Sequence, residues 1–122
     1  MCNLPKSVVL VVEDEPLIRM LAVEAFLDAG FFVLEADCAA QALTISASNV
    51  AIEVLFTDVN MPGDMNGIDL AKHLKRLNPE LHLIITSALP VLRPVDQLPA
   101  LFVAKPYHAD EVCSAASRLL AA

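Results

Sequence analysis

Short apolar runs alternate with helical patterns along the chain, and this alternation restricts the fold more than any other feature. Five runs rich in Val, Ile, Leu and Phe are typical of buried parallel strands, at residues 7–12, 31–36, 53–57, 81–86 and 101–104. A strand–helix repeat favours right-handed crossovers, which place helices on both faces of a parallel sheet. The sequence therefore predicts one doubly wound α/β domain of the flavodoxin-like type, with a five-stranded parallel sheet in the order 2-1-3-4-5.

Four helices are predicted between and after these strands. The first begins at Pro16 and ends before Gly30, which can adopt the left-handed conformation of a helix terminator. Its inward face is expected to carry Leu17, Ile18, Leu21 and Ala25. The second spans residues 38–47. The third is capped by Asn66, and its inward stripe is expected to be Leu70, Ala71, Leu74 and Leu77.

The last helix is expected over residues 108–120, with Val112, Ala115, Ala116 and Leu119 facing inward. A further helix would be expected between Ser87 and Leu101. Three prolines, Pro90, Pro94 and Pro99, oppose it, because proline lacks an N–H donor and clashes with the preceding turn. The segment is therefore predicted to be a loop or at most one helical turn.

Composition excludes several classes of protein. The chain has 122 residues, 57% of them apolar, which suits one folded core rather than disorder. Its net charge of -7 opposes direct binding to nucleic acid. No apolar run approaches the roughly 20 residues of a membrane-spanning helix, and no secretory signal is recognisable at the start, so we expect a cytoplasmic protein without membrane insertion. The scattered Cys2, Cys38 and Cys113 are expected to be reduced.

Charged and hydroxyl side chains stand where several predicted strands end. Glu13 and Asp14 follow the first strand, Asp58 the third, Ser87 the fourth and Lys105 the fifth. Each has an ordinary explanation by itself: an acid beside a helix start, a turn residue or a solvated lysine. Because the carboxyl ends of parallel strands share one edge of the sheet, we expect the five side chains to converge into a ligand site there.

Three carboxylates held together repel one another unless a cation or protons neutralise them. Magnesium fits such a set best, because it prefers oxygen ligands and shares its remaining positions with water or phosphate oxygens. A carboxylate can then attack a phosphorus atom while lysine and metal neutralise the phosphoryl oxygens. The chemistry predicted from these residues is formation of an aspartyl phosphate.

Four separated motifs then support a resemblance to a known family. They are Val11-Val12-Glu13-Asp14-Glu15-Pro16, Thr57-Asp58-Val59-Asn60-Met61-Pro62, Ser87-Ala88 and Lys105-Pro106-Tyr107. Because the four motifs occur in this order, the chain resembles the receiver domain of bacterial two-component response regulators over essentially its whole length. The expected domain is residues 1–122, with residues 1–6 as a short tail.

The resemblance implies a role for each site residue. Asp58 would accept a phosphoryl group from a phosphohistidine of a sensor histidine kinase or a histidine phosphotransfer protein. Glu13, Asp14, Asp58 and the backbone carbonyl of Asn60 would hold Mg²⁺, and Lys105 would bind a phosphoryl oxygen.

The resemblance also implies a switch that responds to phosphorylation. Ser87 would turn its hydroxyl toward the phosphoryl group, with Thr86 as the second choice, and Phe102 would turn inward behind it. A permanent core position is the alternative for Phe102. The Lys105–Pro106 bond is commonly cis in the family. The output partner is not implied.

The chain departs from the family pattern in three places. Ser87 and Lys105 are closer in sequence than usual, and the prolines between them oppose a regular fourth helix, so the usual output and dimerisation face is not expected. The loop at residues 63–67 is one residue longer than is common, and Glu13 stands where aspartate is commoner.

Two alternative functions compete with the phosphoacceptor role. A pseudo-receiver would bind a partner without being phosphorylated. A small phosphatase of the haloacid dehalogenase type is disfavoured, because that class needs an acid two positions after the nucleophile, where this chain has Asn60. We therefore expect no enzyme beyond self-catalysed phosphorylation and dephosphorylation.

Overall fold

Five strands form one parallel sheet in the order β2-β1-β3-β4-β5 in the computed structural model, which describes residues 7–48, 51–88 and 99–121. The strands are β1 (Val8–Val12), β2 (Phe32–Ala36), β3 (Val54–Asp58), β4 (His82–Ser87) and β5 (Ala100–Ala104). All four neighbouring pairs are parallel. The predicted fold class and strand order are confirmed, and the strand boundaries differ from the prediction by at most one residue.

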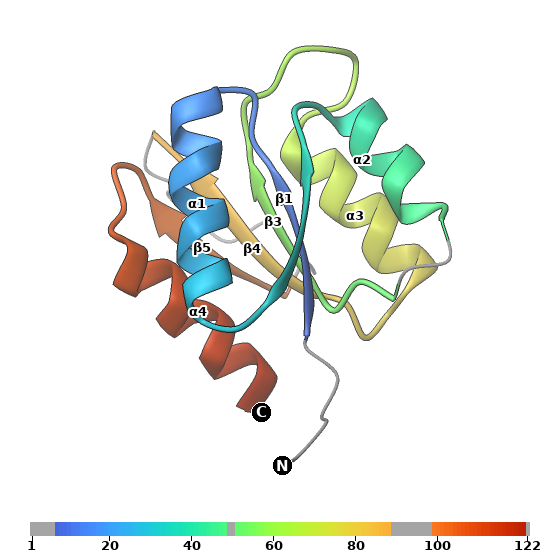
Figure 1. Cartoon of the computed structure of the whole chain (residues 1–122). Helices are drawn as coiled ribbons and strands as arrows, with labels where there is room; N and C mark the ends of the chain where they lie inside the picture. Colours follow the sequence, from blue (N-terminus) through green and yellow to red (C-terminus); the bar gives the residue numbers. More distant parts are fainter. Residues whose placement is uncertain (1–6, 49–50, 89–98, 122) are drawn as a thin grey trace.

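Two of the described helices cover each face of the sheet (Figure 1). α1 (Pro16–Asp28) and α4 (Ala109–Ala121) pack together on one face, and α2 (Ala39–Ser46) and α3 (Gly67–Leu77) pack on the other. Successive strand side chains point to opposite faces. Val9 and Val11 therefore enter the core under α1 and α4, whereas Leu10 and Val12 enter the core under α2 and α3.

The helix ends follow the predicted signals. Pro16 occupies the first turn of α1, and Gly30 has a positive φ of 92° after its end. Asn66 caps α3: its side chain accepts a hydrogen bond from the backbone N–H of Asp69, and the Asp69 carboxylate accepts one from the N–H of Asn66. Such reciprocal caps satisfy donors that would otherwise be unpaired at a helix start. In α4, Val112, Ala115 and Ala116 are buried, as expected.

The predicted inward face of α1 is wrong in part. Leu17 is 80% exposed and Leu21 is also exposed, whereas Ala22, Ala25 and Phe26 are buried. The helix is apolar on nearly all sides, so its periodicity did not distinguish its faces. The ring of Phe26 decides the rotation, because it packs edge-on against Phe31 and Phe56 with centroids 5.2 and 5.4 Å apart.

Three further expectations have different outcomes. Leu77 is 71% exposed rather than inward, because it is the last residue of α3 and the buried stripe ends at Leu74. The predicted irregular segment after Ser87 falls mainly on residues 89–98, outside the described part, as does Cys2. Cys38 and Cys113 are free thiols. Among the described residues, no helix has the length and apolar character needed to cross a bilayer.

Candidate functional site

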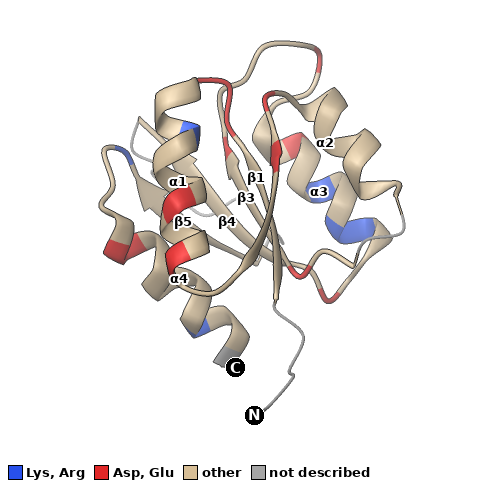
Figure 2. Ribbon diagram, viewed as in Figure 1, with Lys and Arg blue, Asp and Glu red and all other residues tan. Residues whose placement is uncertain are grey.

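The predicted site residues meet at the carboxyl edge of the sheet. Glu13 and Asp14 follow β1, Asp58 ends β3, Ser87 ends β4 and Lys105 follows β5. Figure 2 shows the acidic segment after β1 at the same edge as the end of β3. The convergence expected from strand order is therefore present.

A buried ion cluster lies at the centre of this edge. The Lys105 ammonium lies 2.5 Å from Oε1 of Glu13 and 3.1 Å from Oδ2 of Asp58. The side chains of Lys105, Glu13 and Asp58 are only 11%, 2% and 7% exposed, respectively. Since burial weakens solvent screening, these charges act strongly on one another and tie together the ends of β1, β3 and β5.

The cluster shifts the proton affinities of its members. Burial raises the pKa of Glu13 to about 7, and the charge of Asp58 adds to this, although Lys105 opposes it. Burial disfavours the charged form of Lys105, but its hydrogen bonds to Glu13 and Asp58 prevail and raise the pKa of Lys105. Two carboxylates share one ammonium, so the site has room for additional positive charge.

We predict that Glu13 makes the free energy of unfolding depend on pH. Its pKa is about 7 in the folded chain and 4.5 ordinarily, so between these values the folded state binds more protons than the unfolded state. Stability should therefore fall as pH rises from about 4.5 to about 7, by up to about 3 kcal/mol. Urea unfolding at pH 5 and pH 7.5 measures this fall. Glu13→Gln should remove most of it, and an equal fall in both proteins would contradict the assignment.

The acidic residues fit a magnesium ion. Carboxylate oxygens of Glu13, Asp14 and Asp58 all lie within 4.8 Å of one another. Glu13 and Asp58 are buried, whereas Asp14 is partly exposed, so the set opens to solvent on one side. Hard oxygen donors with one open side suit a cation that keeps some of its water.

Backbone contacts hold the acidic residues in place. The Nη1 group of Arg19 donates to the carbonyl of Glu13 over 2.8 Å, and the backbone N–H of Asp14 donates to Oε2 of Glu13 over 3.0 Å. The N–H of Lys105 donates to the carbonyl of Ser87 over 2.9 Å. Arg19 was not anticipated from the sequence, because a helix arginine carries no local signal of its distant acceptor.

Gly67 is a second contributor that sequence reasoning missed. A Cβ atom added there would overlap the backbone carbonyl oxygen of Asp58. The N–H of Gly67 also donates to the carbonyl of Val59 over 2.9 Å. The start of α3 can approach the phosphoacceptor candidate this closely only because Gly67 has no side chain.

Gly67→Ala should therefore be strongly destabilising, by about 3 kcal/mol, because either the end of β3 or the start of α3 must move. Gly63→Ala is the matched control: Gly63 has a positive φ of 105°, but nothing lies within 4 Å of an added Cβ. Its cost should be about 1 kcal/mol, from backbone strain alone. Urea denaturation measures both, and equal losses would show that the close approach is unimportant.

Of the predicted switch residues, Ser87 and Thr86 lie at the sheet edge that carries the acidic site. Ser87 and Thr86 are 7% and 1% exposed at the end of β4, and Thr86 is in register with Asp58. Phe102, on β5, is partly buried against the core under α2 and α3. The positions of Ser87 and Thr86 do not decide which of the two supplies the hydroxyl of the predicted switch.

A groove of about 700 Å³ connects the acidic site with α1. Its lining includes Asp58 and Lys105 of the acidic site, Ile18 and Leu21 of α1, and also Asp14, Pro106 and Tyr107. The Lys105–Pro106 peptide bond is cis, as the resemblance implied. The groove thus joins a polar end to an apolar one.

A family model decides what kind of domain this is. The model of the response regulator receiver domain matches residues 9–117, which is most of the chain. The chain belongs to this family. Among curated relatives, the receiver domain is 31% identical over 116 residues to Sporulation initiation phosphotransferase F of Bacillus subtilis, covering 92% of each protein.

Solved structures agree with this assignment. The receiver domain superposes on a response regulator receiver protein from Sinorhizobium medicae with a TM-score of 0.88 and 23% identity, over 98% of both chains. It also matches response regulator protein TrrA from Thermotoga maritima, solved in complex with Mg²⁺–BeF, with a TM-score of 0.82 and 26% identity. That match covers 93% of this chain and 98% of TrrA. The fold is that of a two-component receiver domain.

Proposed function

We propose that this receiver domain accepts a phosphoryl group on Asp58 from a phosphohistidine of a sensor kinase or a histidine phosphotransfer protein. The observation that carries the proposal is the placement of the Lys105 ammonium 3.1 Å from Asp58 Oδ2, at the end of a groove that opens to solvent. A cation beside a carboxylate is suited to neutralise the oxygens of an incoming phosphoryl group.

In the proposed transfer, an Asp58 carboxylate oxygen attacks the phosphorus atom of the phosphohistidine. The new O–P bond forms as the P–N bond breaks, and the electron pair of the broken bond stays on the imidazole nitrogen, which takes a proton from solvent. Lys105 binds a phosphoryl oxygen and stabilises the charge of the acyl phosphate. The reaction needs a donor and yields one modified aspartate, so the domain acts as a signalling module and undergoes only self-catalysed phosphorylation and dephosphorylation.

Glu13, Asp14, Asp58 and the backbone carbonyl of Asn60 are the residues proposed to hold Mg²⁺. When bound, magnesium supplies positive charge that reduces repulsion between the carboxylates and the phosphoryl oxygens. The mutual distances of the three carboxylates, within 4.8 Å, support this ligand set.

Phosphorylation is proposed to shift a two-state equilibrium. The Ser87 hydroxyl would donate to a phosphoryl oxygen in one conformer, and Phe102 would move further into the core behind it. The added negative charge favours the conformer in which hydroxyl and lysine both contact it. The switch would change the surface that an output partner binds.

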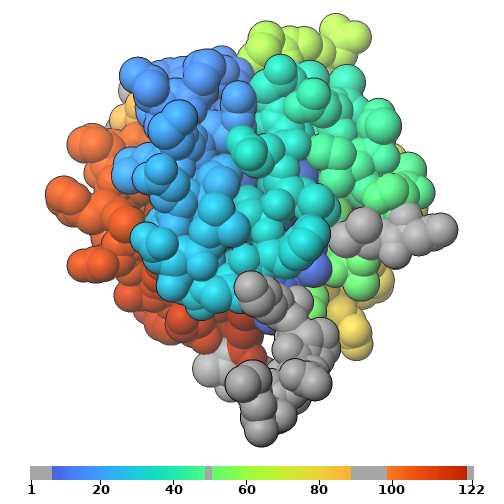
Figure 3. All heavy atoms as spheres, in the orientation of Figure 1, coloured from blue at the N-terminus to red at the C-terminus, as the bar shows by residue number. Residues whose placement is uncertain are grey.

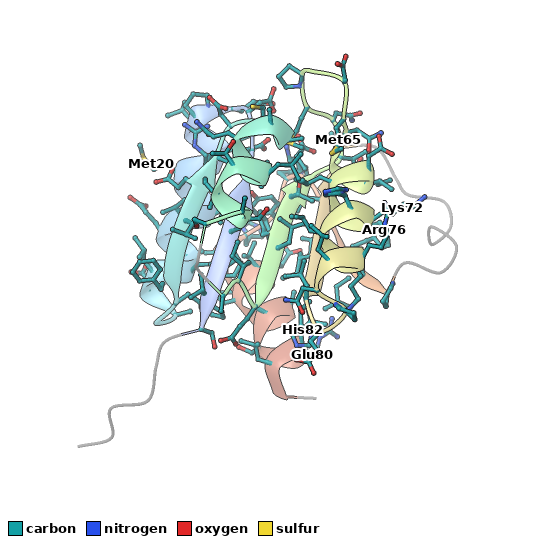
Figure 4. All side chains as sticks on the ribbon, turned by 90° about the vertical axis from the view of Figure 1, so that its right-hand side faces the viewer. Met20, Met65, Lys72, Arg76, Glu80 and His82 are labelled. Carbon is teal, nitrogen blue, oxygen red and sulfur yellow. The ribbon has the colours of Figure 1, made fainter. Side chains whose placement is uncertain are left out.

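The exposed apolar face of α1 is proposed as the surface for the phosphohistidine-bearing partner. It consists of Leu17, Met20 and Leu21, which are 80%, 55% and 42% exposed. Figure 3 shows α1 at the surface between the C-terminal helix and the segment that follows α1, and Met20 points away from the body of the molecule in Figure 4. The groove leads from this face directly to Asp58, so a partner packed on α1 could present its phosphohistidine there.

Leu17→Glu should slow phosphoryl transfer from a phosphohistidine protein by about tenfold, because it places a charge in an apolar contact. Leu77→Glu is the matched control, since Leu77 is also exposed but lies on α3, on the other face of the sheet. Transfer is measured with a histidine phosphotransfer domain that phosphorylates the unmodified chain. A small phosphodonor should react equally with all three proteins. Equal slowing by both substitutions would exclude α1 as the docking face.

The remaining proposals concern the whole chain. Residues 1–122 are proposed to form one receiver domain, acting in the cytoplasm, without direct contact to nucleic acid or insertion into a membrane. The net charge of -7 supports the absence of a nucleic-acid surface.

Figure 4 shows Lys72 and Arg76 of α3 pointing away from the domain, and we interpret these cations as solvated.

Incubation with acetyl phosphate tests the proposed function. Intact mass spectrometry should show addition of one phosphoryl group with magnesium present and much less with a chelator. A pseudo-receiver would gain no mass at any donor concentration. A phosphatase would instead release phosphate continuously from an unactivated monoester, which we do not expect because Asn60 cannot act as the required acid.

A further inference from the structure

The side chain of Arg19 connects α1 to the ends of β1 and β2. Its Nη1 group donates to the backbone carbonyl of Glu13 over 2.8 Å, and its Nε group donates to Oε1 of Glu35 in β2 over 3.3 Å. The Arg19 side chain is 22% exposed, whereas that of Glu35 is 53% exposed. The proposed transfer uses neither contact, although one of them ends on a residue of the acidic site.

The two contacts of Arg19 differ in what they can do. An ion pair with so exposed a carboxylate contributes little to stability, because water and salt screen it. The bond to the Glu13 carbonyl is stronger than an ordinary one, since its donor is charged. A guanidinium is planar and rigid, so the bond to Glu35 at Nε restricts the direction in which Nη1 reaches Glu13.

The peptide unit between Glu13 and Asp14 is held at both of its polar atoms. Its carbonyl oxygen accepts from Arg19, and its N–H donates to Oε2 of Glu13 over 3.0 Å. The preceding peptide unit is fixed as well, because the N–H of Glu13 donates to the carbonyl of Ala36 over 3.1 Å. Since a peptide unit is planar, these bonds fix the direction in which Asp14 leaves the backbone.

Asp14 depends on this support more than the other carboxylates of the site do. Glu13 and Asp58 are buried and both contact Lys105, whereas Asp14 is not buried. In the part of the chain that the structure describes, the Asp14 carboxylate accepts no hydrogen bond and joins no ion pair. The backbone therefore sets its position, within 4.8 Å of the other two carboxylates.

We propose that Arg19 is a positioning residue for the acidic site. Its bond to the Glu13 carbonyl keeps the Asp14 carboxylate beside that of Asp58, and Glu35 holds Arg19 in the orientation that makes this bond. The inference rests on the proposed function, because Mg²⁺ is the ion that these carboxylates are proposed to hold.

The charge of Arg19 and its positioning role affect magnesium binding in opposite directions. A guanidinium near the site repels a divalent cation, so if charge alone mattered, removal of Arg19 would strengthen magnesium binding. If Arg19 positions Asp14, the same removal weakens binding, because the ligands lose their arrangement. The direction of the change in Kd therefore separates the two roles.

Magnesium titrations followed by amide chemical shifts in NMR spectra measure this Kd and show whether each protein is folded. Arg19→Met should weaken binding by about tenfold. Arg19→Lys should weaken it less, because an ammonium can still donate to the Glu13 carbonyl but lacks the fork that contacts Glu35 as well. Arg76→Met is the matched control: Arg76 is exposed on α3, and its removal should leave the Kd unchanged.

A double-mutant cycle tests whether Glu35 acts through Arg19. In the unmodified chain, Glu35→Gln should weaken magnesium binding by about threefold, because Arg19 loses one of its two anchors. In the Arg19→Met background, the same substitution should have almost no effect. Equal factors in both backgrounds would show that Glu35 acts by its charge alone, which would overturn its role in holding Arg19.

The outcomes distinguish this inference from the proposed function. Equal or tighter magnesium binding by Arg19→Met would overturn the role of Arg19 and leave the phosphoacceptor proposal intact. Absence of magnesium binding by the unmodified chain would contradict the proposed metal site, and the role of Arg19 with it. If Arg19→Met does not fold, Arg19→Lys and Glu35→Gln decide, and an unchanged Kd in both would overturn the inference.

Discussion

Asp58→Asn is expected to abolish phosphoryl incorporation from acetyl phosphate in the presence of magnesium. The amide lacks the anionic oxygen that attacks phosphorus, while its size and position are unchanged. Folding should not suffer, because the substitution removes one of two carboxylates that share the Lys105 ammonium. Intact mass spectrometry on both proteins, together with their urea unfolding midpoints, measures the two effects.

Asp64→Asn is the matched control for this experiment. Asp64 is exposed in the loop after β3, a few residues from Asp58 in sequence. Its substitution should leave incorporation unchanged. Phosphoryl gain that persists in Asp58→Asn would place the acceptor at another residue, and equal loss in both variants would indicate a general effect of charge.

Lys105→Met should produce the second large effect, on stability at pH 8. The ammonium contacts both Glu13 and Asp58, and all three side chains are nearly buried. Removing one member of a buried ion cluster leaves uncompensated charge, which typically costs about 3–5 kcal/mol. At pH 5.5 the loss should be smaller, because Glu13, with a pKa of about 7, is then mostly protonated and uncharged.

Lys72→Met serves as the control, since Lys72 is exposed on α3 and forms no ion pair with any described residue. Its free energy of unfolding should change by less than about 0.5 kcal/mol. The comparison is made by urea denaturation at both pH values. If the two lysine variants lose the same stability at pH 8, the ion cluster does not stabilise the fold.

Sequence reasoning predicted the sheet and the convergence of the site for the same physical reason. Strands buried on both faces must be apolar throughout, so β1, β3 and β4 stand out as continuous runs. Polar residues directly after such runs necessarily lie at one edge of a parallel sheet. Asp14, Asp58 and Lys105 could therefore be grouped before any distance was known.

The orientation of α1 could not be predicted from its periodicity. Leu17 and Phe26 are equally plausible core residues by hydropathy, and packing of the Phe26 ring against Phe56 decides between them. The choice depends on side chains from β3, which are distant in sequence. The same packing leaves Leu17 exposed, as part of the apolar surface proposed for partner docking.

The contacts within the site also could not be predicted from the sequence. Gly67 is needed because a side chain there would overlap the backbone carbonyl of Asp58, and Arg19 contributes by donating to the backbone carbonyl of Glu13. Both carbonyls are backbone groups, which every residue has, so the residue types do not indicate these contacts. Tyr107 likewise has the sequence pattern of an aromatic core residue, and nothing in that pattern indicates that its hydroxyl lacks a partner among the described residues.

Chemical mapping of the modified residue tests the central claim most directly. After reaction with acetyl phosphate and magnesium, borohydride converts an aspartyl phosphate to homoserine, and peptide sequencing by mass spectrometry locates it. We predict homoserine at position 58 and unmodified aspartate at positions 14 and 64. Homoserine at another position, or none after donor excess, would contradict the assignment of Asp58 as the phosphoacceptor.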